Sequence, residues 1–231
     1  ESLRAHSLNK DDMVVMKKIF WEGNYDGIFQ FSEKGIRELG TRVRPDCFED
    51  ISAVCALYRP GPLGSKMDEL FVENKRNKDD IKYGHPILER LLKNTYGCMI
   101  YQEQLLKIGL ELGKLPMKDV NRLRKLFLKK DKSKSDEFLD NEKKELKGKL
   151  VVGCKENGWT EEQANDLWAS IAKFGGYGFN VAHSKSYALI TMQTAHLSTY
   201  HPLEFAAAVM TVQQSGDMQR HVNDIKKRGI K

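Results

Sequence analysis

The chain has 231 residues, of which 40% are hydrophobic and 30% are charged, and its formal net charge is +6. This content suffices for a buried core, and no apolar run approaches the roughly 20 residues that a membrane-spanning helix needs. The four cysteines include no C-x-x-C pair and no signal peptide opens the chain, so we expect no zinc knuckle, no disulfide framework and a soluble, cytoplasmic protein with reduced thiols.

Helix signals predominate from the N-terminus onward. A helix opens at Asn9 and runs to about Trp21, the DGIFQF stretch at 26–31 is short and strand-like, and Ser32 caps a helix that reaches toward Leu39. Further helices are predicted from 46 or 48 to before 60, and near 65–76, 86–96, 102–112, 116–130, 136–157, 160–173, 185–200 and 202–214. The pattern predicts a mainly α, compact multi-helix domain with a few short strands or extended segments.

The excess positive charge is concentrated in residues 118–134, KDVNRLRKLFLKKDKSK, which hold eight Lys or Arg against two Asp. On a helix, one stripe is basic and the other side is apolar. The basic stripe comprises Lys118, Arg122, Lys125 and Lys129, and the apolar side comprises Val120, Leu123 and Phe127. Arg124 falls at the edge of the apolar side, where a partly buried guanidinium is held in a fixed direction. The stretch indicates an anion-binding face for phosphates, with a merely solvated face as the alternative.

A glycine-rich loop, GGYGFNVAHSKS at 175–186, precedes the helix predicted to start near Ser184 or Lys185. Asn180, His183 and Ser184 converge there on a helix N-terminus, which favours anions such as phosphate. The alternative is a simple turn in which Asn180 and Ser184 only cap the helix. No second His or Cys stands at ligand spacing from His183, so we predict no metal site.

Two further stretches carry candidate contacts. ALYRPGP at 56–62 places Arg59 before a rigid Pro-Gly-Pro turn, either as a presented cation or as an exposed residue at a helix end. YGCMIYQEQ at 96–104 supplies Tyr101, Gln102 and two more polar residues that either contact a ligand or cap a helix.

Taken together, five segments resemble the bacterial replicative family C DNA polymerases, the alpha subunits of DNA polymerase III. They are GIFQFSEKGIREL, FEDISAVCALYRPGPL, HPILERLLKNTYGCMIYQEQ, LRKLFLKK and KFGGYGFNVAHSKSYALITMQTAHLSTYHPLEFAAAVMT. The resemblance runs from about Lys10 to Thr211 and implies the largely helical fingers domain. It also implies a division into a segment joining the palm to the fingers at 1–45, the fingers at 46–214, and a segment leading out of the domain at 215–231.

The resemblance assigns roles to particular residues. Arg124 and Lys125 match a paired basic motif, usually Arg-Arg, that faces the triphosphate of the incoming nucleotide. Asn180, His183 and Ser184 match a polar loop near the same nucleotide. We therefore expect the following to bind one triphosphate together: Arg122, Arg124, Lys125, Lys129, Asn180, His183 and Ser184. Further contacts with DNA or nucleotide are expected from Arg59, Tyr101, Gln102, Lys130 and Lys185. Leu128 replaces a common Gly and Lys185 a common small residue.

The same resemblance indicates what this chain lacks. The family's palm holds Mg²⁺ with carboxylates that include a D-x-D motif, and no D-x-D occurs here; the pair Asp140 and Glu142 is interpreted as solvated charge. We predict no catalytic or metal-binding residue in this chain and no polymerase activity from it alone. The chain begins at Glu1 rather than Met, as expected of a segment cut from a longer protein.

The implied partners are dNTP, template–primer DNA, the palm and other domains of the same polymerase, and a sliding clamp reached through segments outside this chain. Two alternatives remain open. One is a non-enzymatic, basic helical DNA-binding module. The other is a free-standing nucleotide-hydrolysing enzyme, which the lack of a P-loop motif disfavours.

Overall fold

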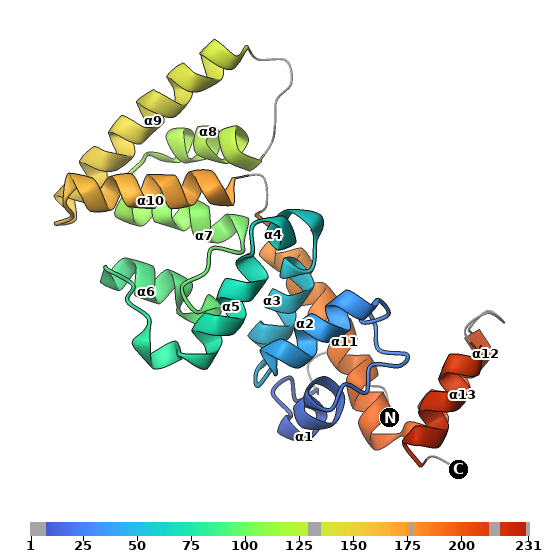
Figure 1. Cartoon of the computed structure of the whole chain (residues 1–231). Helices are drawn as coiled ribbons and strands as arrows, with labels where there is room; N and C mark the ends of the chain where they lie inside the picture. The colour runs from blue at the N-terminus through green and yellow to red at the C-terminus, as the bar shows by residue number, and fades with distance from the viewer. Residues whose placement is uncertain (1–7, 129–134, 176–177, 213–217, 230–231) are drawn as a thin grey trace. The chain divides into compact units, whose positions relative to one another are not determined.

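The computed structural model describes residues 8–128, 135–175, 178–212 and 218–229. Within these residues the chain is mainly α-helical, as predicted, with thirteen α-helices, short π and 3₁₀ segments and no sheet (Figure 1). One isolated parallel bridge joins Tyr101 to Phe179. None of the described helices is both long enough and apolar enough to cross a membrane.

The helices divide between two compact units. Unit 1 comprises residues 1–58 and 182–231, and unit 2 comprises residues 59–181. Unit 1 contains α1 (Met13–Val15), a π-helical turn (Met16–Trp21), α2 (Lys34–Val43), α3 (Phe48–Leu57), nearly all of α11 (Val181–Tyr200), α12 (Pro202–Val212) and α13 (Met218–Lys227). Unit 2 contains α4 (Pro60–Gly64), α5 (Met67–Arg76), a 3₁₀ turn (Lys78–Asp80), α6 (Pro86–Leu92), a 3₁₀ turn (Lys93–Thr95), α7 (Gln102–Lys107), a π-helical turn (Ile108–Leu112), α8 (Met117–Leu128), α9 (Asp136–Glu156) and α10 (Glu161–Phe174). The division predicted at 45/46 and 214/215 concerns the longer polymerase and stays a prediction.

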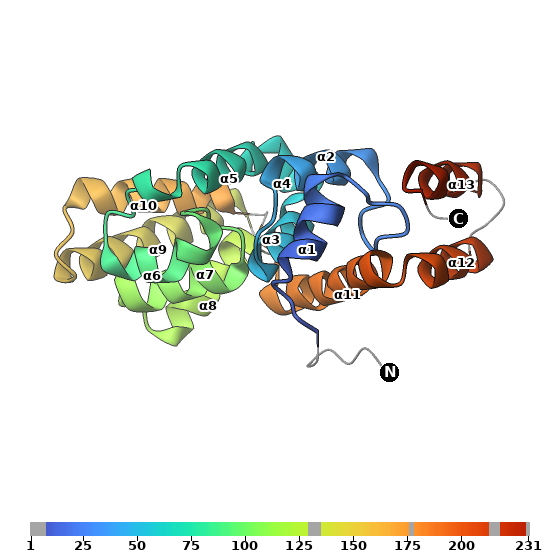
Figure 2. The same ribbon diagram turned by 90° about the horizontal axis from the view of Figure 1, so that it is seen from below.

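In unit 1, α2 packs against α3 and against the π-helical turn, and the first turns of α11 meet α3, where Ser184 bonds to Ser52 (Figure 2). The core of unit 1 includes an aromatic cluster in which the Tyr25 and Phe31 rings stack with centroids 5.0 Å apart, while Phe20 meets both edge-on. Gly40 lies beneath this cluster, where a Cβ would come within 2.6 Å of the Tyr25 hydroxyl. The close fit explains why α2 carries a glycine at this position despite its low helix propensity.

The DGIFQF stretch at 26–31 is a pair of consecutive turns, so the strand-like prediction was wrong. Ile28 N–H donates to the Tyr25 carbonyl and Phe31 N–H donates to the Ile28 carbonyl, each at 3.1 Å. Gly27 has φ +72° and Gln30 has φ +66°, which breaks extended backbone. The turn faces α11, where the Thr194 hydroxyl accepts the Phe29 N–H and the Thr191 hydroxyl donates to the Phe29 carbonyl.

Unit 2 is a helical bundle with its own apolar core. α9 packs beside α10 and α8 (Figure 1). The buried side chains are drawn from α6 to α10: Leu88, Leu92, Leu105, Ile108, Leu112, Val120, Leu123, Leu146, Leu150, Ala164, Leu167, Trp168, Ile171 and Phe174. These repeat at helical spacing in the sequence, which is why the helices were predictable from periodicity.

Most predicted helices are confirmed within a few residues, but α11 starts at Val181 rather than near Lys185, and α4 and α13 were not predicted. The early start of α11 has a tertiary cause, because the Glu103 carboxylate accepts the Val181 N–H at 3.1 Å. A cap supplied by a residue 78 positions away leaves no local sequence signal.

Candidate functional site

The apolar side of α8 docks as predicted. Val120 and Leu123 are fully buried, and the Phe127 ring meets the Trp168 ring edge-on with centroids 5.3 Å apart. Gly175, just after α10, lies directly against Phe127, since a Cβ there would be 2.7 Å from Cδ1 of that ring. The last turn of α8 therefore lies beside the start of the glycine-rich loop.

Arg122 is engaged by three carboxylates. Its Nη1 donates to Asp119 at 2.9 Å, its Nε to Glu142 at 3.1 Å and its Nη2 to Glu145 at 2.7 Å. These hydrogen bonds raise the pKa of the Arg122 guanidinium far above its ordinary value, and the bond to Glu145 has the largest effect. Lys149 also pairs with Asp119 and Glu145, so two cations face three carboxylates with a formal charge of −1 (2 − 3). Arg122 is already neutralised by this cluster, which ties α8 to α9.

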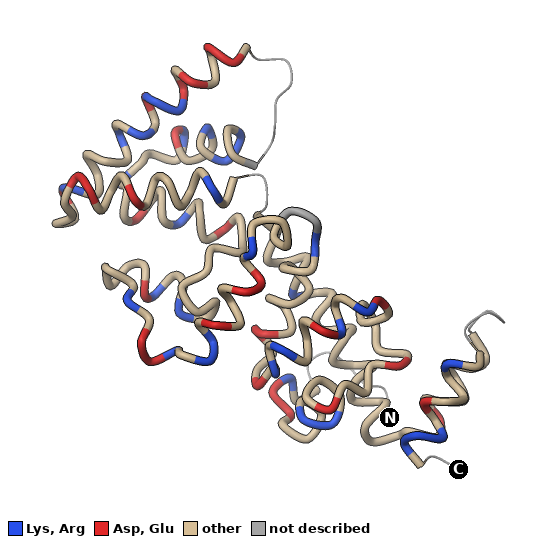
Figure 3. The backbone as a smooth tube through the Cα atoms, in the orientation of Figure 1, with Lys and Arg blue, Asp and Glu red and all other residues tan. Residues whose placement is uncertain are grey.

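Glu142 belongs to this cluster, so its interpretation as solvated charge was wrong. Its side chain is 9% exposed and accepts from Arg122. Asp140 is exposed and pairs with Lys143 at 2.9 Å. Along α9, acidic positions predominate in the first turns and basic positions follow (Figure 3). The sequence does not predict that Arg122 of α8 pairs with carboxylates of α9, because only the packing of α8 on α9 brings these side chains together.

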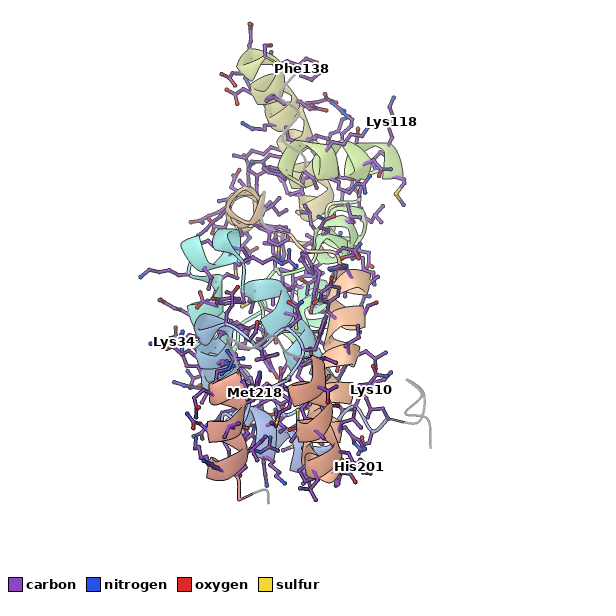
Figure 4. The ribbon with its side chains drawn as sticks, turned by 90° about the vertical axis from the view of Figure 1, so that its right-hand side faces the viewer. Lys10, Lys34, Lys118, Phe138, His201 and Met218 are labelled. Atoms are coloured by element: carbon purple, nitrogen blue, oxygen red, sulfur yellow. The ribbon has the colours of Figure 1, made fainter. Side chains whose placement is uncertain are left out.

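Three cations of α8 stand apart from the Arg122 cluster. Lys118 and Lys125 are exposed, and Lys118 points away from the neighbouring ribbons (Figure 4). Arg124 is half-buried as predicted, and its buried Nε has no hydrogen-bond partner in the described part of the chain. A buried guanidinium N–H ordinarily has a partner. Lys129 and Lys130 lie outside the described residues.

The polar loop is held by the 101–104 segment of unit 2. Gln102 N–H donates to the Phe179 carbonyl at 2.9 Å, and Phe179 N–H donates to the Ile100 carbonyl at 3.0 Å. The Gln102 side-chain amide donates to Gly178 at 2.9 Å, and Asn180 Nδ2 donates to Glu103 at 3.0 Å. Tyr101 is 7% exposed, so its ring is packed rather than presented.

Arg59 lies over this loop. Its guanidinium is centred 3.9 Å from the Phe179 ring centroid, a cation–π stack. The Arg59 residue as a whole is exposed. Arg59 therefore presents a flat cation on a support fixed to the 101–104 segment.

The remaining predicted residues lie in unit 1 on the first turns of α11. Ser184 is fully buried, and its hydroxyl donates to the Ser52 carbonyl at 2.6 Å. His183 is exposed, with its ring 4.2 Å from the Tyr187 ring, and Lys185 is exposed and pairs with Glu49 at 3.5 Å. Ser184 thus serves a helix–helix contact, while His183 and Lys185 reach the surface.

One group of possible metal ligands, Asp46, Cys47 and Asp50, occurs within the described residues. Burial and the neighbouring Asp50 carboxylate raise the pKa of the Cys47 thiol to about 12, so the thiol stays protonated at neutral pH. Asp50 accepts the Asp46 N–H at 3.1 Å at the start of α3. A protonated thiol does not suit Mg²⁺, which prefers oxygen ligands.

Comparison with known proteins gives consistent matches. Residues 1–150 match the model of the bacterial DNA polymerase III alpha subunit finger domain. The DNA polymerase III subunit alpha of Campylobacter jejuni is 40% identical over 227 residues, covering 97% of this chain and 18% of the relative. The corresponding subunits of Helicobacter pylori and Aquifex aeolicus are 40% identical over 222 residues and 38% identical over 205 residues, covering 95% and 89% of this chain and 18% and 17% of the relatives. The chain spans less than a fifth of the length of these curated relatives.

Proposed function

Because this chain belongs to the bacterial DNA polymerase III alpha subunit finger-domain family, we propose that it is one part of a longer DNA-directed DNA polymerase. The longer protein extends primers during replication. The part of this chain is to bind the triphosphate of the incoming dNTP and the nearby template–primer DNA. The palm and other domains of the same polymerase are its immediate partners, a sliding clamp is reached through other segments, and the protein works in the cytoplasm.

The observation that carries the proposal is the state of Arg124. Its Nε is buried and has no partner among the described residues, and a desolvated donor on a charged group favours an anionic ligand. Lys125 is exposed on the next position. Gly175 lies against Phe127 in the same turn of α8, so the glycine-rich loop begins next to these cations.

We assign the remaining predicted residues more specific parts. We propose that Asn180, which bonds to Glu103, contributes to the site from the loop, and that Arg59, stacked on the Phe179 ring, offers its cation to DNA or nucleotide. Arg122 and Ser184 are engaged in contacts within their own units, so we propose structural roles for them rather than contact with the nucleotide. Roles for His183 and Lys185 in nucleotide or DNA binding stay predictions.

Mg²⁺ is proposed to be held by carboxylates of the palm. The metal would supply charge stabilisation for phosphoryl transfer. The Asp46, Cys47 and Asp50 group does not fit it, since the Cys47 thiol keeps its proton. What this chain contributes is orientation and charge neutralisation of the triphosphate by its own side chains.

The test is Arg124→Ala in the full-length polymerase. We expect kcat/KM for dNTP to fall by the equivalent of about 1.5–3 kcal/mol, the scale of a hydrogen bond to a charged group, with primer–template affinity changed much less. His183→Ala should act in the same direction but more mildly, because an imidazole offers fewer hydrogen-bond donors than a guanidinium. Lys143→Ala, which removes an exposed cation paired with Asp140, is the control and should leave both quantities unchanged.

The alternative, a basic DNA-binding module, predicts the opposite result: Arg124→Ala would weaken DNA binding and leave the use of dNTP unchanged. If Arg124→Ala damaged only DNA binding and left the dNTP dependence intact, the triphosphate proposal would be wrong. Binding of DNA through Lys118 and Lys125 should weaken steeply with salt, because each phosphate contact releases counterions. Anisotropy titrations at several salt concentrations measure that slope.

A further inference from the structure

The YQEQ stretch at 101–104 is a connector with an inward and an outward side. Gln104 forms the inward side. Its Oε1 accepts the N–H groups of Ile100 and Tyr101 at 2.8 and 2.9 Å, and its Nε2 donates to the Thr95 hydroxyl at 2.7 Å. Gln104 is 8% exposed and is followed by the fully buried Leu105. The connector is therefore fixed to the core of unit 2.

Gln102 and Glu103 form the outward side and hold the 178–181 loop. Gln102 binds the carbonyls of Gly178 and Phe179, through its side chain and its backbone N–H. Glu103 uses both carboxylate oxygens: Oε1 accepts from Asn180 Nδ2 at 3.0 Å, and Oε2 accepts from Val181 N–H at 3.1 Å. Glu103 alone therefore fixes both a side chain of the loop and the first N–H of α11.

This geometry changes the chemistry expected at the start of α11. A free helix N-terminus is an anion site, but the Val181 N–H already has an anionic partner in Glu103. A phosphate at that N–H would have to displace a carboxylate held by two hydrogen bonds. Glu103 therefore competes with a phosphate for the first N–H of α11, and the loop side chains that could contact a triphosphate depend on the connector for their positions.

We propose that Glu103 is a positioning residue for nucleotide recognition. It acts through Asn180 and Val181 and sets the conformation of residues 178–181, in the same polar loop whose first residue, Gly175, lies against Phe127 of α8. The proposal rests on the proposed function of Arg124 and Lys125. The same connector supports Arg59, because the Phe179 backbone is bonded on both sides to Ile100 and Gln102 and its ring carries the guanidinium.

The experiment is a hydrogen-bond swap in the full-length polymerase. Asn180→Asp places a second carboxylate against that of Glu103, and the repulsion should raise KM for dNTP about tenfold or more. In the double variant Glu103→Gln, Asn180→Asp, the Gln amide group donates to the new Asp carboxylate and the Gln carbonyl accepts from the Val181 N–H. The double variant should return to within about twofold of the wild-type KM. Glu103→Ala removes the hydrogen bonds to both Asn180 and Val181 and should raise KM about fivefold or more, with primer–template Kd unchanged.

Two controls separate the possible failures. Glu162→Ala removes an exposed carboxylate elsewhere in unit 2 and should leave KM unchanged, while Arg124→Ala reports the proposed function itself. If Arg124→Ala raises KM but Glu103→Ala does not, or if the swap fails to rescue Asn180→Asp, the positioning role is overturned and the function stands. If Arg124→Ala is also silent, the proposed function fails.

Hydrogen exchange gives a readout independent of activity. In the full-length protein without DNA or nucleotide, Glu103→Ala should accelerate exchange of the amides at 179 and 181 and leave those of α9 unchanged. Faster exchange together with the raised KM supports positioning through the loop. Unchanged exchange, or faster exchange with a wild-type KM, overturns it.

Discussion

Substituting Gly153 by Ala should strongly destabilise unit 2, whereas the same change at Gly148 in the same helix should not. Gly153 lies in α9 where that helix crosses the chain between the π-helical turn and α8. A Cβ at 153 would lie 1.9 Å from the Gly113 carbonyl oxygen and 2.3 Å from its carbon. A Cβ at 148 would meet nothing within 4 Å.

The magnitude follows from what must move. Asn157, the residue just after α9, donates through Nδ2 to the carbonyls of Glu111 and Leu112 at 3.1 and 2.7 Å, so the backbone just before Gly113 is fixed to the end of α9. Relieving a contact this short requires separating α9 from that backbone, which also loosens Leu146 and Leu150. Overpacking costs about 1–3 kcal/mol where flexible side chains yield, and we expect at least about 3 kcal/mol here because backbone must yield. The gain in helix propensity, about 1 kcal/mol, offsets only part of this.

The assay is urea denaturation of the purified chain followed by circular dichroism, with both variants and wild type measured in parallel. Gly148→Ala should raise the free energy of unfolding by about 0.5–1 kcal/mol. A Gly153→Ala variant as stable as wild type would show that α9 does not lie in direct contact with the Gly113 backbone. Equal effects from the two substitutions would refute the reasoning in the same way.

Three other outcomes are expected. Hydrogen bonds from Arg122 and Lys149 lower the pKa of Glu145 from 4.5 to about 2, so the contribution of Glu145 to stability is complete above pH 4.5 and is lost as the pH falls through 2. Glu145→Gln should therefore destabilise the chain at pH 7, and the denaturation curves of the variant and the wild type should converge near pH 2. Ser184→Ala should lower the free energy of unfolding by about 1 kcal/mol through the lost bond to Ser52, without raising KM for dNTP in the full-length polymerase; a raised KM with unchanged stability would restore Ser184 as a direct contact. The purified chain alone should give no primer extension with Mg²⁺ and four dNTPs, and robust extension would contradict placement of the catalytic carboxylates outside it.

Local sequence determined most of the helices. Apolar residues at helical spacing identify the core sides of α8 and α9, and capping residues and Pro mark several helix ends, because these signals act within one or two turns of the chain. The apolar side of α8 and the half-buried position of Arg124 were predictable for the same reason. The family resemblance rested on long contiguous motifs, which need no knowledge of packing.

Tertiary structure alone decided which charges are free and where the loop is held. Arg122 and Arg124 are two residues apart and equally basic in sequence, yet one meets three carboxylates while the Nε of the other has no partner among the described residues. Glu103 caps α11 from 78 residues away. The same reason explains why the sequence predicts solvated charge at Glu142, whose side chain in fact bonds to Arg122. The partner of a charged side chain is set by packing between distant segments, because Coulomb energy depends on separation in space rather than along the chain.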